Sequence, residues 1–259
     1  MAEIRVQPWC APDGASASGI WQVVISHPER LNAMTRAMWQ QLRQAFEQLQ
    51  QRSDVRCIVV QGEGEAFCAG GDISEYPDFR FTPAGLHGFH EGDVWGALQA
   101  MLACDVPIVA SIAGACMGAG VEIASCCDVR WAADNAKFGA PIAKLGFPMA
   151  PKEMQLLSQV LDGHMVRRML LEAAVFDANQ MAAAGFIAGP VTGPELHLQV
   201  ARSALRIASW APQAARLTKQ SLRALACGQA VRDPFAYADT AEHREGIDAF
   251  LHKRAPQFA

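Results

Sequence analysis

A glutamate behind a turn of small residues is the group in this 259-residue chain that most clearly could do chemistry. It is Glu122, in the stretch CMGAGVE, which ends an apolar strand and opens a helix. At the start of a helix, unpaired backbone N–H groups and the positive end of the helix dipole favour a developing negative charge. This turn and this carboxylate could therefore hold an anion and move a proton beside it.

A second turn of small residues comes earlier, in FCAGGDISEY (67–76). Its small side chains leave the backbone N–H groups of Gly70 and Gly71 accessible to a ligand. Because glycine is the commonest turn residue, either turn alone is better explained as a plain chain reversal. The two turns together, one strand apart and in the same order, are more specific. Facing each other, they would make an oxyanion hole with two donors.

Other chemistries that these residues suggest fit the chain poorly. GACMGAG resembles the pyrophosphate turn of short-chain dehydrogenases, but it follows the third recognisable strand instead of the first. Neither Tyr76 nor Tyr237 has the lysine four residues later that those proteins pair with tyrosine. The chain has no G-x-x-x-x-G-K-[ST] phosphate loop, and its seven histidines show no metal-binding spacing. We therefore expect neither a dinucleotide nor a metal.

The eight cysteines form no C-x-x-C pair, and most of them lie in apolar runs such as VRCIVV and EIASCC. We expect free thiols that pack as small core residues in a reducing compartment. A nucleophilic role for Cys68 is the alternative. No histidine lies near Cys68 in the sequence to activate it, which makes that role the weaker explanation.

The composition limits the possible partners. Hydrophobic residues make up 51% of the chain and charged residues 19%, which is typical of a globular protein with a sizeable core. The net charge of -4 and the scattered lysines and arginines give no basic surface, so we expect no nucleic-acid partner. The N-terminal sequence has no basic region before an apolar run, and no segment approaches about 18 apolar residues. We expect a soluble, cytoplasmic protein with no signal peptide or membrane span.

Strands and helices alternate through the first half of the chain. Apolar runs predict strands over residues 19–26, 55–67 and 106–115. A helix is predicted over residues 35–51, because apolar residues recur on one face and glutamines and arginines lie opposite. That apolar face consists of Met38, Leu42, Phe46 and Leu49. The alternation is typical of an α/β fold with a mainly parallel sheet and crossover helices.

From Pro151 onward the periodicity predicts helices only. The expected helices span residues 152–161, 164–173, 178–186, 195–208, 212–226 and 234–254. No linker between them is long enough to separate independent domains. The second half is therefore expected to be a helical region that continues the α/β core.

Five segments together resemble the enoyl-CoA hydratase/isomerase superfamily, also called the crotonase superfamily. They are HPERLNAM (27–34), FCAGGDISE (67–75), the stretch 112–146, AAGFIAGPV (183–191) and EHREGIDAFLHKRAPQF (242–258). The match spans nearly the whole chain, in the order and with the spacing of that superfamily. The resemblance implies a crotonase-like spiral of ββα units over residues 1–190 and a C-terminal helical trimerisation region over 191–259. It also implies an acyl-CoA thioester substrate, no cofactor beyond the coenzyme A of that substrate, and a homotrimer or homohexamer.

The resemblance also implies roles for individual residues. The oxyanion hole would consist of the backbone N–H groups of Gly71 and Ala119, and Glu122 would be one of two glutamates that hold water and move its protons. Without the resemblance, a glutamate that complements the helix dipole is an equal explanation for Glu122. Coenzyme A would be held by Arg30, Leu31, Ala69, Asp72, Ile73, Ser74, Phe250 and Lys253. Lys253 is equally well explained as a solvated lysine near a helix C-terminus.

One position departs from the superfamily pattern. The second glutamate normally follows the proline of FGxPE, whereas this chain reads FGAPIA and places Ile142 there. An isoleucine cannot transfer a proton. Another titratable group could compensate, either Glu153 or a member of the loop 75–93 that should border the acyl pocket. The candidates in that loop are Glu75, Asp78, His87, His90, Glu91 and Asp93, and the sequence does not choose among them.

Taken together, these residues predict an acyl-CoA lyase of the enoyl-CoA hydratase type, which stabilises a thioester enolate. An enoyl-CoA isomerase, or another enolate reaction on a CoA thioester, is the nearest alternative. A weakly catalytic protein that only binds CoA thioesters is the alternative from a different class, because the residue at position 142 is apolar.

Overall fold

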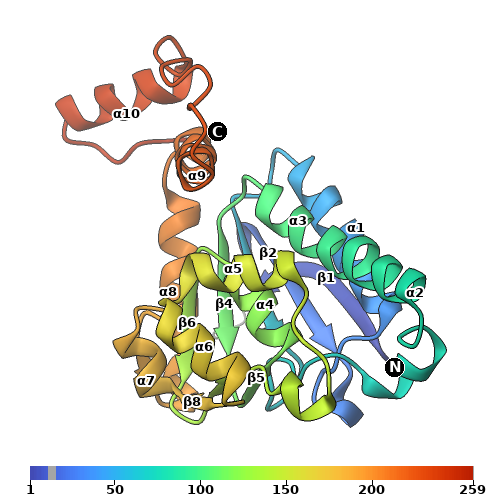
Figure 1. The fold of residues 1–259 in the computed structure, drawn as a ribbon. Coiled ribbons are helices and arrows are strands. Elements are labelled where there is room, and N and C mark those ends of the chain that lie inside the picture. The colour runs from blue at the N-terminus through green and yellow to red at the C-terminus, as the bar shows by residue number, and fades with distance from the viewer. Residues whose placement is uncertain (11–15, 259) are drawn as a thin grey trace.

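The computed structural model of the chain describes residues 1–10 and 16–258, and places a central sheet between layers of helices (Figure 1). This sheet has six strands in the order β1-β2-β3-β4-β6-β9. β1 pairs antiparallel with β2, and every later pair is parallel. The strands are β1 (Glu3–Cys10), β2 (Ser16–Ser26), β3 (Cys57–Gly62), β4 (Ile108–Ile112), β6 (Val129–Ala133) and β9 (Pro190–Val191). The mainly parallel sheet expected from the sequence is confirmed.

Alternate residues of the central strands face two separate parts of the core. In β3, Ile58 and Val60 pack in the larger cluster together with helices α1 (Arg36–Gln50) and α3 (Trp95–Ala103). Their neighbours Cys57 and Val59 pack in a smaller cluster beneath helix α8 (Gly193–Ser209). Because both faces of the sheet are covered, its central strands are continuous apolar runs without polar alternation.

The helix expected over residues 35–51 is confirmed as α1. The hydroxyl of Thr35 accepts a hydrogen bond from the N–H of Met38 at 3.2 Å and so caps the first turn. All four residues of its expected apolar face are buried. α1 packs beside α3. In chain order, a short α2 (Pro83–His87) and a π-helical turn, η3 (Gly88–Val94), come before α3.

A second, three-stranded sheet lies next to the second of the two turns that the sequence singled out. Its order is β5-β7-β8, formed by β5 (Ala115–Met117), β7 (Lys137–Gly139) and β8 (Val175–Asp177). Helix α4 (Ala119–Ser125) starts directly after β5 and is buried along its whole length. Glu122 thus lies in the first turn of a short helix in the interior of the protein.

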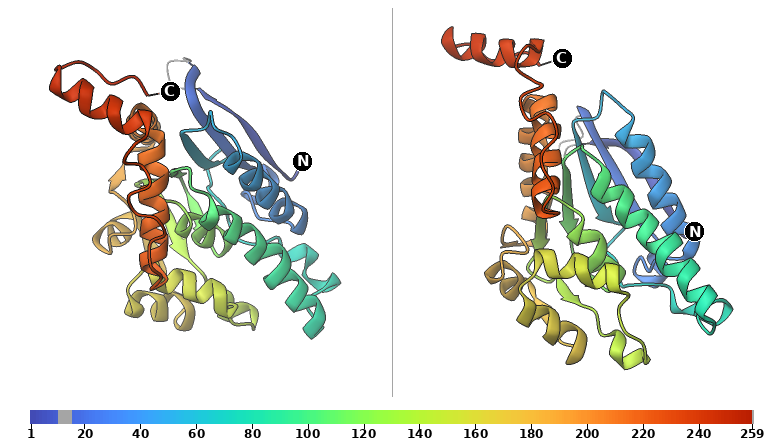
Figure 2. Two further views of the ribbon diagram at one scale, coloured as in Figure 1. Left: turned by 90° about the horizontal axis from the view of Figure 1, so that it is seen from above. Right: turned by 45° about the horizontal axis from the view of Figure 1, so that its top comes forward.

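The helices of the second half are α5 (Pro151–Val160), α6 (Gly163–Leu171), α7 (Ala178–Ala183), α8, α9 (Pro212–Ala226) and α10 (Ala241–Leu251). α10 extends away from the sheet, as the two views of Figure 2 show. α9 lies against the core, where its Lys219 pairs with Asp128 and its Arg223 with Asp105, each at 2.8 Å. The division of the chain at residue 190 stays a prediction.

Two expectations about this half are wrong. It is not purely helical, since β8 and β9 interrupt the helices; each is short and pairs with a strand of the first half. The helix expected over 234–254 begins only at Ala241, because the hydroxyl of Thr240 accepts from the N–H of His243 and starts the helix there.

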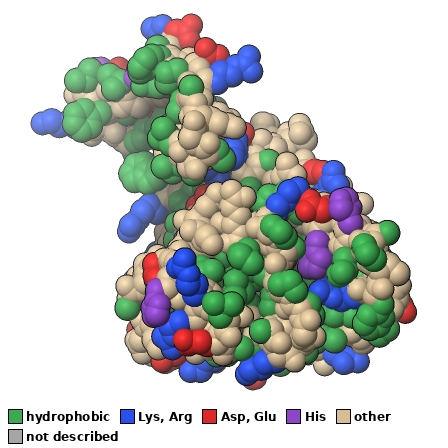
Figure 3. Space-filling view, viewed as in Figure 1, with side chains coloured by type: hydrophobic (Ala, Val, Ile, Leu, Met, Phe, Trp, Pro, Cys, Tyr) green, Lys and Arg blue, Asp and Glu red, His purple; other side chains and the backbone are tan. Residues whose placement is uncertain are grey.

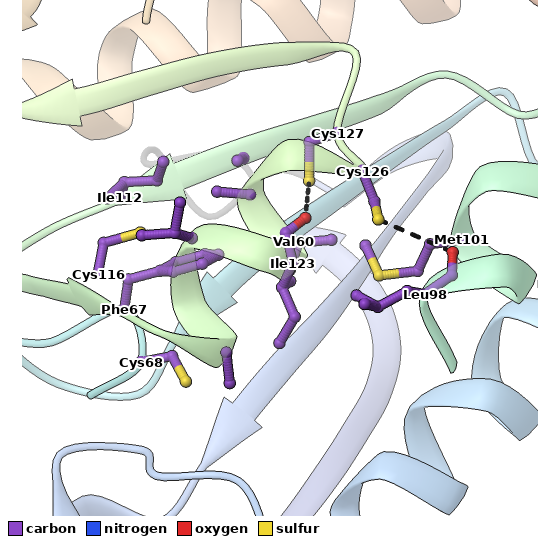
Figure 4. Packing of buried hydrophobic residues seen from close by; sticks show 14 of the residues in the cluster. Val60, Phe67, Cys68, Leu98, Met101, Ile112, Cys116, Ile123, Cys126 and Cys127 are labelled. Atoms are coloured by element: carbon purple, nitrogen blue, oxygen red, sulfur yellow. Dashed lines mark hydrogen bonds between the residues drawn. The ribbon is translucent and has the colours of Figure 1, made fainter. Parts of the chain in front are cut away.

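Six of the eight cysteines are buried, as expected for core thiols, and all eight are free. Figure 4 shows several of them packed among aliphatic side chains of the core. The thiol of Cys126 points to the carbonyl of Leu98, and that of Cys127 to the carbonyl of Ile123 at 3.4 Å. Burial raises the pKa of the Cys68 thiol to about 12. That thiol stays protonated at neutral pH, which argues against the nucleophilic role.

Candidate active site

The two small-residue turns and Glu122 line one cavity of about 350 Å³. Gly71 comes from the first turn, Ala119 from the second and Glu122 from the first turn of α4. Ile142 lines the same cavity from the short helix η4 (Ile142–Leu145). The structure therefore brings together the three residues expected to act in catalysis and the isoleucine that departs from the superfamily pattern.

Backbone hydrogen bonds fix the two turns against each other. Cys68 donates its N–H to the carbonyl of Ala115, and Met117 donates its N–H to the carbonyl of Cys68, each at 2.8 Å. Each turn then contains a glycine with positive φ, which is 118° at Gly70 and 47° at Gly118. This conformation, which suits glycine, directly precedes each expected donor, Gly71 and Ala119.

The expected donors have no acceptor within the described part of the protein. Neither the N–H of Gly71 nor that of Ala119 forms a hydrogen bond with a backbone or side-chain atom of residues 1–10 or 16–258. Ala119 is the first residue of α4, so its N–H is one of the orphan donors of a helix N-terminus. Two free amides in one cavity are what an oxyanion hole requires.

Position 71 lies close to the side chain of Tyr76, which favours glycine there. A Cβ atom at Gly71 would lie 2.3 Å from the hydroxyl oxygen of Tyr76. Tyr76 lines the cavity, and burial raises its pKa to about 12, so the hydroxyl stays protonated. Tyr76 could not be selected from the sequence, because nothing in the local pattern predicts that its ring packs against the glycine turn.

The carboxyl group of Glu122 is buried and has no hydrogen-bond partner among the described residues. Burial raises its pKa well above the usual range, and the negative charge of the nearby Glu153 raises it further. Both effects favour the neutral acid. Glu122 is therefore suited to giving up a proton to whatever occupies the cavity.

Glu153 and His90 lie in the cavity and touch each other. Glu153 is in the first turn of α5, and its Oε1 atom is 2.7 Å from Nδ1 of His90. His90 lies in η3, and π-helical turns of this kind are frequent at functional sites. Of the candidates for a second proton-transfer group, these are the two that line the cavity.

The other candidates from the loop 75–93 have different surroundings. The carboxylate of Glu75 accepts the backbone N–H of Arg36, and Asp93 forms an ion pair with the guanidinium of Arg36 at 2.7 Å. Glu91 pairs with Lys152. The remaining two candidates are exposed: Asp78 and His87.

The residues expected to hold coenzyme A do not all lie in the cavity. Ala69 and Ile73 line the cavity. Asp72 caps the helix η2 (Ile73–Asp78), where its carboxylate accepts from the N–H and hydroxyl of Ser74. Three further residues are exposed and lie outside the lining: Arg30, Leu31 and Ser74.

Phe250 lies in the last turn of α10 and Lys253 in the turn that follows the helix, and neither belongs to the lining. Phe250 is 82% exposed. The structure thus does not bring these two residues into the cavity of their own chain.

An arginine that the sequence did not suggest also lines the cavity. The guanidinium of Arg80 lies over two aromatic rings, 3.8 Å from the centre of Phe147 and 4.4 Å from that of Tyr76. Across residues 1–10 and 16–258, no carboxylate forms an ion pair with it. Arg80 is thus a half-buried cation held by aromatic side chains at the wall of the site.

Two further features are absent from the described part of the chain. No group of three or more His, Cys, Asp or Glu side chains that could hold a metal ion occurs among the described residues. In the same part of the chain, no helix has the length and hydrophobicity needed to cross a membrane.

Known proteins share both the sequence and the fold. A sequence model of the enoyl-CoA hydratase/isomerase family matches residues 15–259. The 2,3-dehydroadipyl-CoA hydratase of Escherichia coli is 32% identical over 244 residues, which cover 91% of this chain and 93% of that protein. A probable enoyl-CoA hydratase of Mycobacterium bovis is 30% identical over 244 residues, with the same coverage of 91% and 93%. The crystal structure of an enoyl-CoA hydratase/carnithine racemase from Magnetospirillum magneticum has a TM-score of 0.90 and 32% identity, and covers 94% of this chain and 93% of that one.

Proposed function

Since this chain belongs to the enoyl-CoA hydratase/isomerase family and has an enoyl-CoA hydratase-type function, we propose that its cavity adds water to an α,β-unsaturated acyl-CoA thioester. One observation carries the proposal: two backbone amides without acceptors, at Gly71 and Ala119, line the same cavity as the buried Glu122. The crotonase-like fold expected from the sequence is confirmed by the structural similarity.

The two amides act on the thioester oxygen. When a nucleophile adds to Cβ of the enoyl group, the electrons of the C=C bond move toward the thioester carbonyl and turn it into an enolate oxygen. The N–H groups of Gly71 and Ala119 are in place before the reaction, so they stabilise that charge without reorganising. Removing one such donor typically costs about 10²–10³ in turnover.

Glu122 supplies the proton that the enolate needs. Its neutral acid form is favoured by burial, and the acid lies in the same wall of the cavity as Ala119. As the enolate collapses, the acid proton of Glu122 moves to Cα. Glu122 is left as a carboxylate and is restored by the proton that the water loses when its oxygen bonds to Cβ. The net change is the addition of one water molecule, with its hydroxyl on Cβ and its proton on Cα.

Coenzyme A would lie along the first turn and its neighbours. Ala69 and Ile73 are in the cavity wall. Asp72 and Ser74 are the chain neighbours of Ile73, and Arg30 and Leu31 lie on a separate segment. The backbone links them, because Ala69 donates its N–H to the carbonyl of Leu31 at 3.0 Å. We propose no cofactor beyond the coenzyme A of the substrate.

Assembly is proposed from the apolar limb, by which we mean α9, α10 and the segment between them (residues 212–251). Large apolar side chains on the limb are exposed: Leu222, Leu225, Phe235, Ile247, Phe250 and Leu251. Figure 3 shows hydrophobic side chains gathered on this projecting part of the molecule. A groove of about 490 Å³ runs between α9 and α10. An exposed apolar area of this kind favours association, and we propose a homotrimer or homohexamer in which Phe250 and Lys253 of one subunit approach the site of another.

The buried free thiols favour a reducing compartment, and a cytoplasmic location is proposed on that basis.

The function is tested by incubating the protein with crotonyl-CoA and following the mass of the thioester. A gain of one water, giving 3-hydroxybutyryl-CoA, supports hydration. Movement of the double bond in a 3-enoyl-CoA without a gain in mass would favour the isomerase. Binding of both thioesters with neither reaction would reduce the protein to a CoA-thioester binder.

A further inference from the structure

The cavity contains a second buried carboxyl group, which reaches it from a different helix than Glu122. The side chain of Glu153 is 5% exposed, and that of His90 beside it is 17% exposed. α4 and α5, which carry Glu122 and Glu153, pack against each other. The two carboxyl groups are close enough for the charge of one to raise the pKa of the other.

The contact with His90 orients Glu153 and leaves one of its oxygens free. When Glu153 is ionised, Nδ1–H of His90 donates to Oε1 at 2.7 Å. Within the described residues, no donor reaches Oε2. His90 is itself fixed by its position in η3 and by the edge of its ring against Phe89, with ring centres 5.0 Å apart. A carboxylate held on one oxygen and open on the other is arranged as a general base.

We propose that Glu153, oriented by His90, is the base that activates water, and that it replaces the carboxylate missing at Ile142. The inference rests on the proposed hydration. Glu153 takes a proton from water while the water oxygen forms its bond to Cβ. The electron pair of the C=C bond moves to the thioester oxygen, and the enolate then takes a proton at Cα from Glu122. Glu153 returns its proton to Glu122, so both groups are restored and one water has been consumed.

Other titratable groups face Glu153 and contribute to the charge around it. Glu122 faces it from α4, His90 from η3 and the hydroxyl of Tyr76 from η2. Lys152 is next to it in α5 but pairs with Glu91. A purely structural role for Glu153 is the competing explanation, since a carboxylate in the first turn of a helix complements the helix dipole.

Three variants separate these explanations. Glu153→Gln keeps the size of the side chain and removes the base, so kcat for crotonyl-CoA should fall about 10²-fold or more with little change in KM. His90→Asn should lower kcat less and move the acidic limb of the pH profile. Glu91→Gln is the matched control, because it breaks the neighbouring ion pair with Lys152 outside the cavity and should leave kcat and the pH profile unchanged.

A second reaction keeps this inference distinct from the proposed function. Exchange of the Cα protons of butyryl-CoA in D₂O needs the two amides and the ionised form of Glu122, which takes the Cα proton, but no attacking water. Glu153→Gln favours that form, because it removes the negative charge that raises the pKa of Glu122. Glu153→Gln should retain this exchange while losing hydration, and Glu122→Gln should lose both. Full hydration by Glu153→Gln would overturn the role of Glu153 and leave the proposed function intact. Equal loss of both reactions together with a lower melting temperature would assign Glu153 a structural role.

Arg80 carries a second, independent inference. Its guanidinium lies over the rings of Phe147 and Tyr76, which hold its position, and no described carboxylate neutralises it. Such a cation at the wall of a cavity attracts a carboxylate, which it can bind through two parallel hydrogen bonds. We infer that the acyl group of the substrate ends in a carboxylate and that Arg80 binds it.

A matched pair of substrates tests this. Hex-2-enoyl-CoA has the same chain length as the six-carbon enoyl-CoA whose last carbon is a carboxylate. The wild-type protein should have the higher kcat/KM for the carboxylate, and Arg80→Gln should lower that value about 10-fold or more while leaving hex-2-enoyl-CoA unaffected. Arg80→Lys should recover part of the loss. A wild-type preference for the neutral substrate, or equal effects of Arg80→Gln on both, would overturn the assignment.

Discussion

The N–H of Met117 donates to the carbonyl of Cys68 at 2.8 Å, and this backbone hydrogen bond ties together the two turns of the proposed oxyanion hole. The first donor, Gly71, follows Cys68 closely, and the second, Ala119, follows Met117 closely. The separation of the two donors is therefore set by backbone pairing and by the glycines that precede them. Side chains at these positions matter only where they would collide or remove an N–H group.

Deleting one donor should cost most of the activity. Ala119→Pro removes the N–H at the first residue of α4, a position where proline is tolerated in a helix. Turnover of crotonyl-CoA should fall about 10²-fold or more, while the affinity for butyryl-CoA, measured by calorimetry, changes little. Ala119→Gly, which keeps the N–H, is the control and should retain most of the turnover. Wild-type turnover in the proline variant would remove Ala119 from the mechanism.

The contact between Gly71 and Tyr76 makes a paired prediction. Gly71→Ala places a Cβ atom 2.3 Å from the Tyr76 hydroxyl oxygen, so either the turn or the Tyr76 ring must shift, and hydration should drop about 10-fold or more. Tyr76→Phe removes that oxygen and leaves the nearest ring carbon at 3.3 Å. The double variant should therefore be more active than Gly71→Ala alone. Steady-state kinetics of the wild type, the two single variants and the double variant test this prediction. Additive losses would show that the two residues do not interact.

The sequence predicted the parts of this site that are local in the chain. Gly71, Ala119 and Glu122 each lie in a glycine turn or in the helix that follows it, and strands beside those turns are visible as apolar runs. The Glu153 and His90 pair could be named only as two among several candidates. Whether a polar side chain enters a cavity depends on packing between distant elements, here η3 against α5.

Arg80 and Tyr76 illustrate the same limit. Their positions depend on aromatic rings of other segments, such as Phe147. The periodicity of apolar residues in a sequence does not predict contacts between distant segments. The short strands β8 and β9 were missed for a related reason. Each consists of two or three residues that are extended because a neighbouring strand pairs with them, so their own sequence carries almost no signal.

The pKa of Glu122 makes a prediction about stability. Its pKa in the folded state is raised above the ordinary value of 4.5 by burial and by Glu153, so the folded state holds a proton that the unfolded state releases. The stability contributed by the neutral form is present below about pH 4.5 and is lost as the pH rises toward the folded-state pKa. Glu122→Gln does not titrate and should avoid this loss. Its melting temperature relative to wild type should rise by about 2 °C or more between pH 5 and pH 8, as measured by calorimetry.

A constant difference across that range would contradict the raised pKa. Glu153→Gln, which removes the nearby charge, should flatten the pH dependence of the wild type only in part, because burial is the larger cause.

Association through the apolar limb can be tested with charges. Leu222 and Leu225 on α9 are 63% and 66% exposed in the single chain. Replacing both by lysine should place unpaired charges in the proposed interface and shift sedimentation from a trimer or hexamer toward a monomer. Leu171→Lys is the control, because Leu171 is 78% exposed on α6, outside the limb. A wild-type protein that sediments as a monomer at micromolar concentration would contradict the proposed assembly.

Moving the base back to the superfamily position tests whether Glu153 replaces it. Ile142 lines the cavity and is partly buried, so Ile142→Glu would bring a carboxylate near Glu122 and Glu153. In the wild-type background, a third acid should raise the pKa of Glu122 further and lower the activity at neutral pH. In the Glu153→Gln background only two acids remain, and hydration of crotonyl-CoA should recover about 10-fold or more over Glu153→Gln alone. Ile142→Gln in that background is the control for size and polarity. Equal rates for the Glu and Gln versions would show that position 142 no longer lies where a base can reach the attacking water.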